Sequence, residues 1–330
     1  MEIKQIKVIA DKIRDNVSKV IVGKEEELDL IMVGLFSSGN ILLDDVPGTG
    51  KTVLSKTLAK SVDCDFKRIQ FTPDLLPSDV TGLNIYNQKS GEFDFRPGPA
   101  FTNIMLADEI NRATPRTQSS LLECMEEKQI TVDGETRKLD APYFVIATQN
   151  PVESSGTFPL PEAQMDRFLI RMKLGYPVGA DAKKVLDRFN DANPFNDLEA
   201  VVTKDEIIDI QNSYAKVFVS EPIKDYIVRI VDATRSLEDV SLGVSPRGML
   251  AMMRACQAYA AINGRDHVLP DDVKRLAEPV FAHRLVLRSS YGASEKSVEL
   301  IERLMGRINA PTEEPGARLS EEKAETAEEE

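Results

Sequence analysis

The segment at residues 42–52 restricts most strongly what this chain can fold into. It reads Leu-Leu-Asp-Asp-Val-Pro-Gly-Thr-Gly-Lys-Thr, an apolar run followed by a glycine-containing loop and a lysine. This order is typical of a β-strand, a loop and the start of a helix. Gly48 and Gly50 would let backbone N–H groups approach a polyphosphate, and the following helix offers its positive N-terminal end. The segment predicts a phosphate-binding loop, with a glycine-rich surface turn as the alternative.

Several residues of this loop are expected to contact ATP or its metal ion. Lys51 would reach the β- and γ-phosphates, and the Thr52 hydroxyl would bind Mg²⁺. Asp45 departs from the general pattern, which has a glycine six residues before the lysine. The predicted nucleotide-binding residues of the loop are Val46, Pro47, Gly48, Thr49, Gly50, Lys51, Thr52 and Val53.

A second apolar run, residues 103–109, ends in Asp108 and Glu109. A buried strand of a parallel sheet has this pattern, and its carboxyl end faces the ligand edge. Asp108 is then expected to hold Mg²⁺, mostly through water, and Glu109 to orient and deprotonate the attacking water. A strand ending in solvated acids is common, so this pair indicates an ATPase mainly because it follows a phosphate loop.

A third strand, residues 143–147, leads to Asn150 and a proline. An amide at the tip of a neighbouring strand could hydrogen-bond the γ-phosphate or the attacking water. The alternative is a turn asparagine before proline, which is frequent.

Composition limits the class of partner. The chain has 330 residues, enough for two domains, and a formal net charge of −13. Residues 311–330 hold eight glutamates against Arg318 and Lys323, so we expect a disordered acidic tail. The remaining body is also acidic, which argues against a nonspecific grip on DNA or RNA.

Cysteine and histidine usage argues against a zinc site. Cys64, Cys124 and Cys256 are scattered and are expected to be small core residues. Lone thiols suit a reducing compartment, and residues 1–17 predict an amphipathic helix rather than a signal peptide. No run is long enough for a membrane span, so a cytoplasmic location is expected.

Periodicity divides the chain into an α/β core, residues 1–177, and an all-helical region, residues 178–310. The core elements expected besides those above are a helix at 53–62, strands at 66–71 and 169–174, a hairpin within 84–99, a helix at 114–127 and a hairpin at 129–139. Helices in the second region are expected at 182–190, 204–217, 221–235, 247–263 and 270–287.

Five motifs together resemble the MoxR family of AAA+ ATPases over roughly residues 5–308. They are Val20 to Gly23, Asp108 to Ala113, Ala147 to Pro151, Leu160 to Phe168 and Ser245 to Gly248. An acid followed by Val-Pro-Gly also resembles the phosphate loop of this family. The resemblance implies a P-loop AAA+ core with a parallel five-stranded sheet and inserted hairpins, followed by a small helical lid.

The resemblance also implies roles for individual residues. The segment with Val22 and Gly23 would pack on adenine, and Asn150 would be sensor 1. Arg167 would be the arginine finger, acting on a neighbour's nucleotide, and Arg247 would be sensor 2, in contact with nucleotide from the lid. Arg112 and Arg116 would lie either at a subunit boundary or on a solvated surface.

The function implied is ATP hydrolysis in a ring, expected to be a hexamer. ATP and Mg²⁺ are the implied cofactors. Turnover would remodel a protein client in a chaperone-like way, with a von Willebrand factor A domain protein as a partner. The alternatives are a nucleic-acid motor related to helicases and a switch that barely hydrolyses ATP. Neither predicted hairpin is clearly basic, and Glu109 speaks against the switch.

Overall fold

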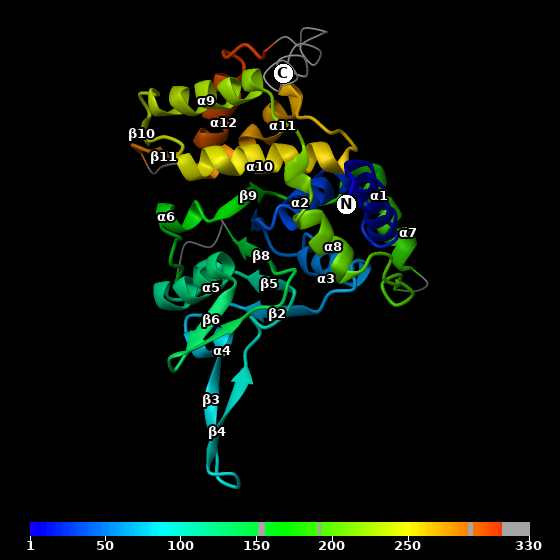
Figure 1. Cartoon of the computed structure of the whole chain (residues 1–330), viewed down its shortest axis with the longest axis vertical. Coiled ribbons are helices and arrows are strands. Elements are labelled where there is room, and N and C mark those ends of the chain that lie inside the picture. The colour runs from blue at the N-terminus through cyan, green and yellow to red at the C-terminus, as the bar shows by residue number, and fades with distance from the viewer. Residues whose placement is uncertain (151–155, 191–192, 290–292, 312–330) are drawn as a thin grey trace, which may run out of the picture.

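The computed structural model describes residues 1–150, 156–190, 193–289 and 293–311, and the predicted acidic tail lies almost wholly outside these ranges. A parallel five-stranded sheet forms the centre, in the order β2-β5-β8-β1-β9 (Figure 1). The strands are β1 (Asn40–Asp44), β2 (Phe66–Gln70), β5 (Ile104–Asp108), β8 (Phe144–Gln149) and β9 (Phe168–Met172). The predicted sheet is therefore confirmed.

Alternate residues of these strands belong to two different cores. Ile41, Leu43 and Ile146 pack with the helices α1 (Ile3–Ser18), α2 (Glu25–Phe36) and α3 (Lys51–Ser61). Leu42 and Val145 pack with α4 (Pro77–Thr81) and α5 (Pro115–Glu127). Successive side chains of a strand point to opposite faces, so helices cover both faces of the sheet.

The helices of the lid share the first of these cores. Apolar residues of α10 (Pro246–Ile262) and α11 (Pro270–Phe281) join those of α1 and α2 in one continuous cluster. The lid therefore rests on the N-terminal helices of the core rather than standing apart from it (Figure 1).

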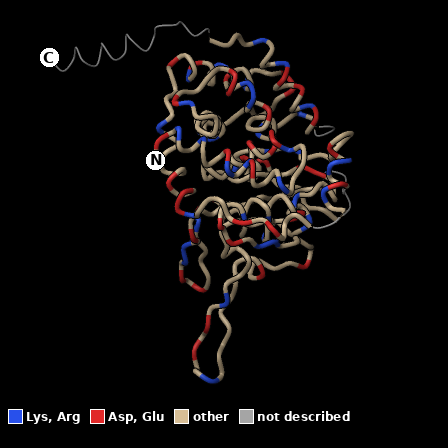
Figure 2. Tube along the Cα trace, turned by 90° about the vertical axis from the view of Figure 1, so that its right-hand side faces the viewer, with Lys and Arg blue, Asp and Glu red and all other residues tan. Residues whose placement is uncertain are grey.

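Two hairpins extend from the part of the core that contains α4 and α5. The long one consists of β3 (Gly82–Asn87) and β4 (Glu92–Pro97), and the short one of β6 (Gln129–Val132) and β7 (Glu135–Lys138). The long hairpin protrudes well beyond the rest of the molecule and carries charges of both signs (Figure 2). Arg137 lies 4.2 Å from the Phe95 ring centroid and Asn84 donates to Asp133 at 2.8 Å, so the short hairpin packs against the base of the long one. Both predicted hairpins are confirmed.

The second region is helical, with some departures from the sequence prediction. Its other elements are α7 (Gly179–Phe189), α8 (Lys204–Gln211), η2 (Tyr214–Lys216), α9 (Glu221–Arg235), η3 (Ala282–Arg284) and α12 (Ala293–Met305). A short antiparallel pair, β10 (Val240–Leu242) and β11 (Val286–Leu287), makes the lid not strictly all-helical. The core also contains two short turns, η1 (Ile110–Arg112) and α6 (Glu162–Met165).

Two predicted helices end earlier than expected. The helix expected at 204–217 stops at Gln211, because the Gln257 side chain donates to the carbonyls of Ala215 and Val217 at 3.0 and 2.9 Å. The helix expected at 270–287 stops at Phe281. No helix among the described residues is long and apolar enough to cross a membrane.

Candidate nucleotide-binding and catalytic site

The loop between β1 and α3 is open and has the conformation expected of a phosphate-binding loop. Gly48 and Gly50 have φ angles of +84° and +89°, a conformation that favours glycine, and Gly50 caps the N-terminus of α3. A Cβ atom at either position would meet nothing within 4 Å, so the space above the loop is open. The buried hydroxyl of Thr49 has no hydrogen-bond partner among the described residues. These features fit a polyphosphate held by backbone N–H groups at a helix N-terminus.

Lys51 lies at the first position of α3, with its side chain largely buried. Its Nζ donates to the Asp45 carbonyl at 3.1 Å. The ammonium therefore points back over the loop, where an incoming phosphate would meet it.

Asp45, the departure from the general motif, has a structural role. Its Oδ2 accepts hydrogen bonds from the backbone N–H groups of Leu174 and Gly175 at 2.6 and 3.0 Å. The carboxylate thus ties the phosphate loop to the end of β9. A glycine at this position could not make these bonds.

An apolar cavity of about 300 Å³ lies beside the loop. Its wall includes Val20, Ile21, Val22, Val53, Leu174, Pro177, Val185 and Phe189. Size and apolar lining fit a nucleotide base. The sequence prediction that the segment with Val22 and Gly23 packs on adenine agrees with this placement for Val22 but not for Gly23, and the residues from α7 were not foreseen.

Gly23 does not line this cavity but permits the approach of α7. Its φ is +63°, and a Cβ there would lie 2.3 Å from Oδ2 of Asp181. Arg188, also on α7, donates to the Ile21 carbonyl at 3.3 Å. α7 therefore closes over the base cavity, whereas no residue of α9 to α12 lines it.

Asp108 and Glu109 lie at the carboxyl end of β5, as predicted. Oδ1 of Asp108 accepts from the Thr148 hydroxyl at 2.7 Å, and Oδ2 accepts from Nε and Nη2 of Arg68 at 3.0 and 2.6 Å. Arg68 was not predicted as a site residue. The Arg68 guanidinium already places a positive charge beside the Asp108 carboxylate that is expected to hold Mg²⁺. This position therefore suits a cation.

Glu109 has a φ of +57°, which is uncommon for a residue with a side chain. Its backbone N–H donates to the Thr148 hydroxyl at 2.9 Å, and its Oε2 accepts from Gln70 and Arg112 at 2.7 and 2.9 Å. Arg112 thus contacts the predicted base, while Arg116 is exposed on α5.

The strand order brings these groups to one edge of the sheet. β8 lies between β1 and β5, so Asn150, directly after β8, falls between the phosphate loop and Asp108. Asn150 is buried, and its carbonyl accepts from Asn111 at 3.3 Å. The loop lysine, Thr52, the two acids and Asn150 therefore share the carboxyl edge expected for an ATPase site.

Arg167 and Arg247 lie at the opposite edge. Arg167 directly precedes β9, and both arginines contact the carboxylate of Glu126, at 3.3 Å from Arg167 Nε and 2.7 Å from Arg247 Nη2. Together with Asn40, at the start of β1, they line one cavity of about 580 Å³. The five residues of β1 span about 16 Å between this cavity and the phosphate loop. The structure therefore does not bring Arg167 or Arg247 to this chain's own phosphate loop.

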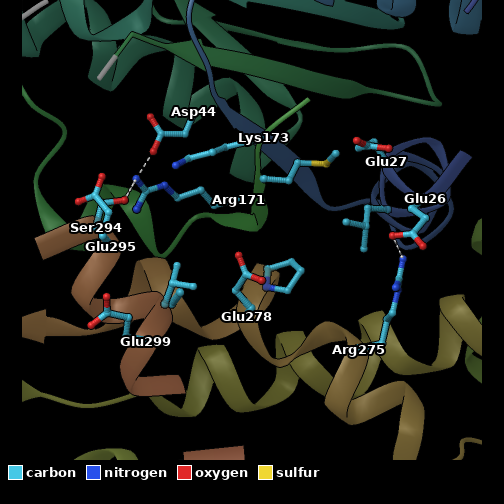
Figure 3. Close-up of a pocket in the computed structure, with 15 residues that line it drawn as sticks. Glu26, Glu27, Asp44, Arg171, Lys173, Arg275, Glu278, Ser294, Glu295 and Glu299 are labelled. Carbon is cyan, nitrogen blue, oxygen red and sulfur yellow. Dashed lines mark hydrogen bonds and ion pairs between the residues drawn. The ribbon is translucent and has the colours of Figure 1, made fainter. Parts of the chain in front are cut away.

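A further cavity of about 570 Å³ separates the end of β9 from the lid (Figure 3). Arg171 donates to Asp44 and to the Ser294 hydroxyl there, which joins the sheet to α12. Five glutamates line it, namely Glu26, Glu27, Glu278, Glu295 and Glu299. Together with Asp44 they outnumber the three basic residues of the lining, Arg171, Lys173 and Arg275, so the net negative charge disfavours a polyphosphate here.

The fold and the site define a nucleotide-binding module of the AAA+ class. Residues 40–170 match the family described as "ATPase family associated with various cellular activities (AAA)", and residues 232–304 match the AAA lid domain. The chain belongs to the MoxR family of AAA+ ATPases.

Relatives and a solved structure support this assignment. The chain is 40% identical to chaperone MoxR1 of Mycobacterium tuberculosis over 86% of this chain and 78% of that protein. It is 49% identical to YeaC of Bacillus subtilis over 92% of this chain and 95% of that protein. A crystal structure of a candidate ATPase from Cytophaga hutchinsonii superposes with a TM-score of 0.86 at 40% identity, covering 93% of this chain and 96% of that one.

Proposed function

We propose that this protein hydrolyses ATP with Mg²⁺ in a ring, a hexamer, and uses the turnover to remodel a protein client. The observation that carries this proposal is the division of the site between two edges of the sheet. One edge holds the phosphate loop, Asp108 and Glu109, and the other holds Arg167 and Arg247. A neighbour that places its arginine edge against this chain's phosphate edge would complete a catalytic site.

The residues of the phosphate edge have distinct roles in this proposal. Gly48, Gly50 and Lys51 hold the phosphates, and Thr52 and Asp108 would hold Mg²⁺, which supplies charge neutralisation on the transferred phosphoryl group. Glu109 takes the proton from the attacking water. Both Arg167 and Arg247 lie at the edge opposite this chain's phosphate loop. This position favours action in trans, on a neighbour's nucleotide.

Complementation between two inactive variants tests the shared site. Arg167→Ala is expected to bind ATP normally and to hydrolyse it about 10³-fold more slowly, because a trans-acting arginine contributes on this scale. Glu109→Gln is expected to bind ATP and to lose about 10²- to 10⁴-fold in rate. Mixed rings contain interfaces with an intact Glu109 on one side and an intact Arg167 on the other, so part of the activity returns.

Arg303→Ala, which alters an exposed arginine on α12, is the matched control and keeps wild-type turnover. If the two inactive variants co-assemble on sizing chromatography and no activity returns at any mixing ratio, the proposal that two neighbouring subunits share one catalytic site is wrong.

The proposed class of client follows from the names of two relatives of this chain. Two relatives are named as chaperone MoxR1 and protein MoxR, which supports chaperone-like assembly or activation of a protein complex over a nucleic-acid motor. The partner proposed is a protein with a von Willebrand factor A domain. Three free thiols fit a reducing, cytoplasmic environment.

A trap experiment tests the client class. Glu109→Gln with ATP should hold a client, and a pull-down read by mass spectrometry should recover a protein, with Lys51→Ala as the control that cannot load ATP. Nucleic acid as the dominant captured species would overturn the protein-client proposal.

A further inference from the structure

We propose that Arg284, a residue of the lid, positions Arg167 for its action on the neighbouring nucleotide. This inference rests on the trans role of Arg167 proposed above and adds to it a residue that holds the arginine in place.

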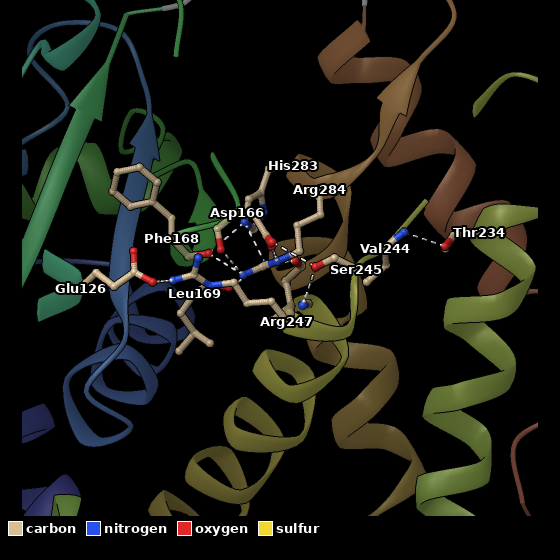
Figure 4. A network of polar contacts seen from close by, with 12 residues as sticks. Glu126, Asp166, Phe168, Leu169, Thr234, Val244, Ser245, Arg247, His283 and Arg284 are labelled. Atoms are coloured by element: carbon tan, nitrogen blue, oxygen red, sulfur yellow. Dashed lines mark hydrogen bonds and ion pairs between the residues drawn. The ribbon is translucent and has the colours of Figure 1, made fainter. Parts of the chain in front are cut away.

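One guanidinium fixes the chain on both sides of Arg167 (Figure 4). Arg284 Nε donates to Oδ1 of Asp166 at 2.7 Å, directly before Arg167. Its Nη2 donates to the carbonyl of Phe168 at 2.6 Å and its Nη1 to that of Leu169 at 3.2 Å, directly after. The side chain of Arg284 is only 2% exposed, so these contacts are formed away from water.

The start of β9 needs such a partner because it is irregular and lies at the sheet edge. Within the described ranges β9 pairs only with β1, and their register shifts so that Leu169 has no residue opposite it on β1. Carbonyl groups left over by this bulge would be unsatisfied without another donor. Arg284 donates to the carbonyls of both Phe168 and Leu169 from more than a hundred positions later in the chain, and Nε2 of the adjacent His283 also lies 3.1 Å from the Phe168 carbonyl.

The same contacts keep the Asp166 carboxylate occupied. Oδ1 bonds Arg284, and Oδ2 accepts from the Ser245 hydroxyl at 3.0 Å. Asp166 is the immediate chain neighbour of Arg167 and would be a natural ion-pair partner for it. With both oxygens held by the lid, Arg167 contacts Glu126 instead, the carboxylate that it shares with Arg247.

Gly248 makes room for this arrangement. A Cβ at this position would lie 2.7 Å from Cδ of Arg284, so only glycine allows the arginine stem to pass. The segment Ser245 to Gly248 therefore serves Arg167 in two ways: its serine holds Asp166, and its glycine admits Arg284. Through Arg284, a movement of the lid would be transmitted to Arg167.

Arg284→Lys tests the role, because lysine keeps the charge but cannot bond Asp166, Phe168 and Leu169 together. The variant is expected to bind a fluorescent ATP analogue as the wild type does and to lose about 10²-fold in kcat, the scale of a small misplacement of a catalytic group. The distinguishing measurement is complementation. Glu109→Gln subunits supply a well-placed Arg167. Arg284→Lys subunits mixed with them should therefore regain activity, as Arg167→Ala subunits do.

Arg275→Lys is the matched control. Arg275 also joins lid to core, at 2.7 Å from Glu26, and its hydrogen-bond and ion-pair contacts among the described residues do not involve the chain around Arg167, so the kcat of this variant should stay at the wild-type value. Asp166→Asn keeps the shape at the other end of the contact and should show the same kcat loss and the same complementation if Arg284→Lys does not fold.

The outcomes separate the two proposals. If Arg167→Ala is complemented and the folded Arg284 or Asp166 variants are not, this inference is wrong while the shared site stands. Unchanged kcat in these variants, or a loss confined to ATP affinity, also overturns it. If Arg167→Ala itself is not complemented, both proposals fail.

Discussion

The side-chain amide of Gln70 donates a hydrogen bond of 2.7 Å to Oε2 of Glu109. Gln70 is the last residue of β2, and its own Oε1 accepts from Arg68 at 2.7 Å, while Arg68 also holds Asp108. The tips of β2 and β5 are thus joined by a continuous polar chain that engages both acids of the candidate site. The carboxylate proposed as the base is held by donors that would compete with a water molecule.

Gln70→Ala is expected to raise the basal ATPase rate by up to about tenfold. A hydrogen bond to a charged group contributes about 1.5–3 kcal/mol, and part of this is regained through Arg112, which still contacts Glu109. Steady-state phosphate release measures the effect. Lys67→Ala, an exposed residue of the same strand, is the control and should change nothing. A fall in rate toward that of Glu109→Gln would show instead that Gln70 holds the base in its productive position.

Local patterns in the sequence predicted the parts of the site that are formed by single segments. The phosphate loop, Asp108, Glu109 and Asn150 each follow a strand of the central sheet, and the carboxyl ends of parallel strands meet at one edge. The hairpin at 129–139 was also predictable, because an Asp-Gly pair sets its turn.

Features that depend on distant contacts were not predicted. The helix α2 is apolar on most of its surface and lies buried against the lid, so it lacks the one-sided pattern that identifies a surface helix. The contacts of Arg284 with Asp166 span 118 positions. Nothing in the sequence near either residue shows that they meet. The position of Arg247 at the far edge of the sheet likewise depends on how the lid packs.

Lys51→Ala is expected to weaken ATP binding at least about 100-fold. Removing one partner of a buried charge contact costs about 2–5 kcal/mol, and Lys51 is the buried cation of the phosphate loop. Calorimetric titration with ATP gives the affinity, and Lys56→Ala, an exposed lysine of the same helix, serves as the control. Near-unchanged affinity in a folded Lys51→Ala protein would remove Lys51 from the site.

Asp45→Asn is expected to lower the free energy of unfolding by about 1–3 kcal/mol, because the carboxylate accepts two backbone N–H groups at the end of β9. Both bonds go to the one oxygen Oδ2, so an asparagine could still accept them, but a neutral amide oxygen accepts more weakly than a carboxylate oxygen. Denaturant titration measures the change, with Asp63→Asn as an exposed control. Since Leu174 also lines the base cavity, ATP affinity should fall as well. Unaltered stability and affinity would contradict the structural role assigned to Asp45.

The three thiols are expected to resist alkylation in the folded protein. Burial raises the pKa of Cys64 and of Cys124 to about 12, and burial raises that of Cys256 well above its ordinary value. The thiolate is the reactive form, so at pH 8.5 the folded chain offers far less of it than an exposed cysteine does. Iodoacetamide labelling followed by mass spectrometry should show slow modification of the native protein and fast modification in guanidinium.

The same pKa shifts fix the sign of a pH effect on stability. A raised pKa means that the folded chain keeps its thiol protons while the unfolded chain loses them, so stability is complete below pH 9 and decreases as the pH rises toward 12. Ser18→Cys places a thiol at an exposed position and is the positive control for labelling. Rapid labelling of Cys124 or Cys256 in the native protein at pH 8.5, at the rate of that control, would contradict their placement in the core.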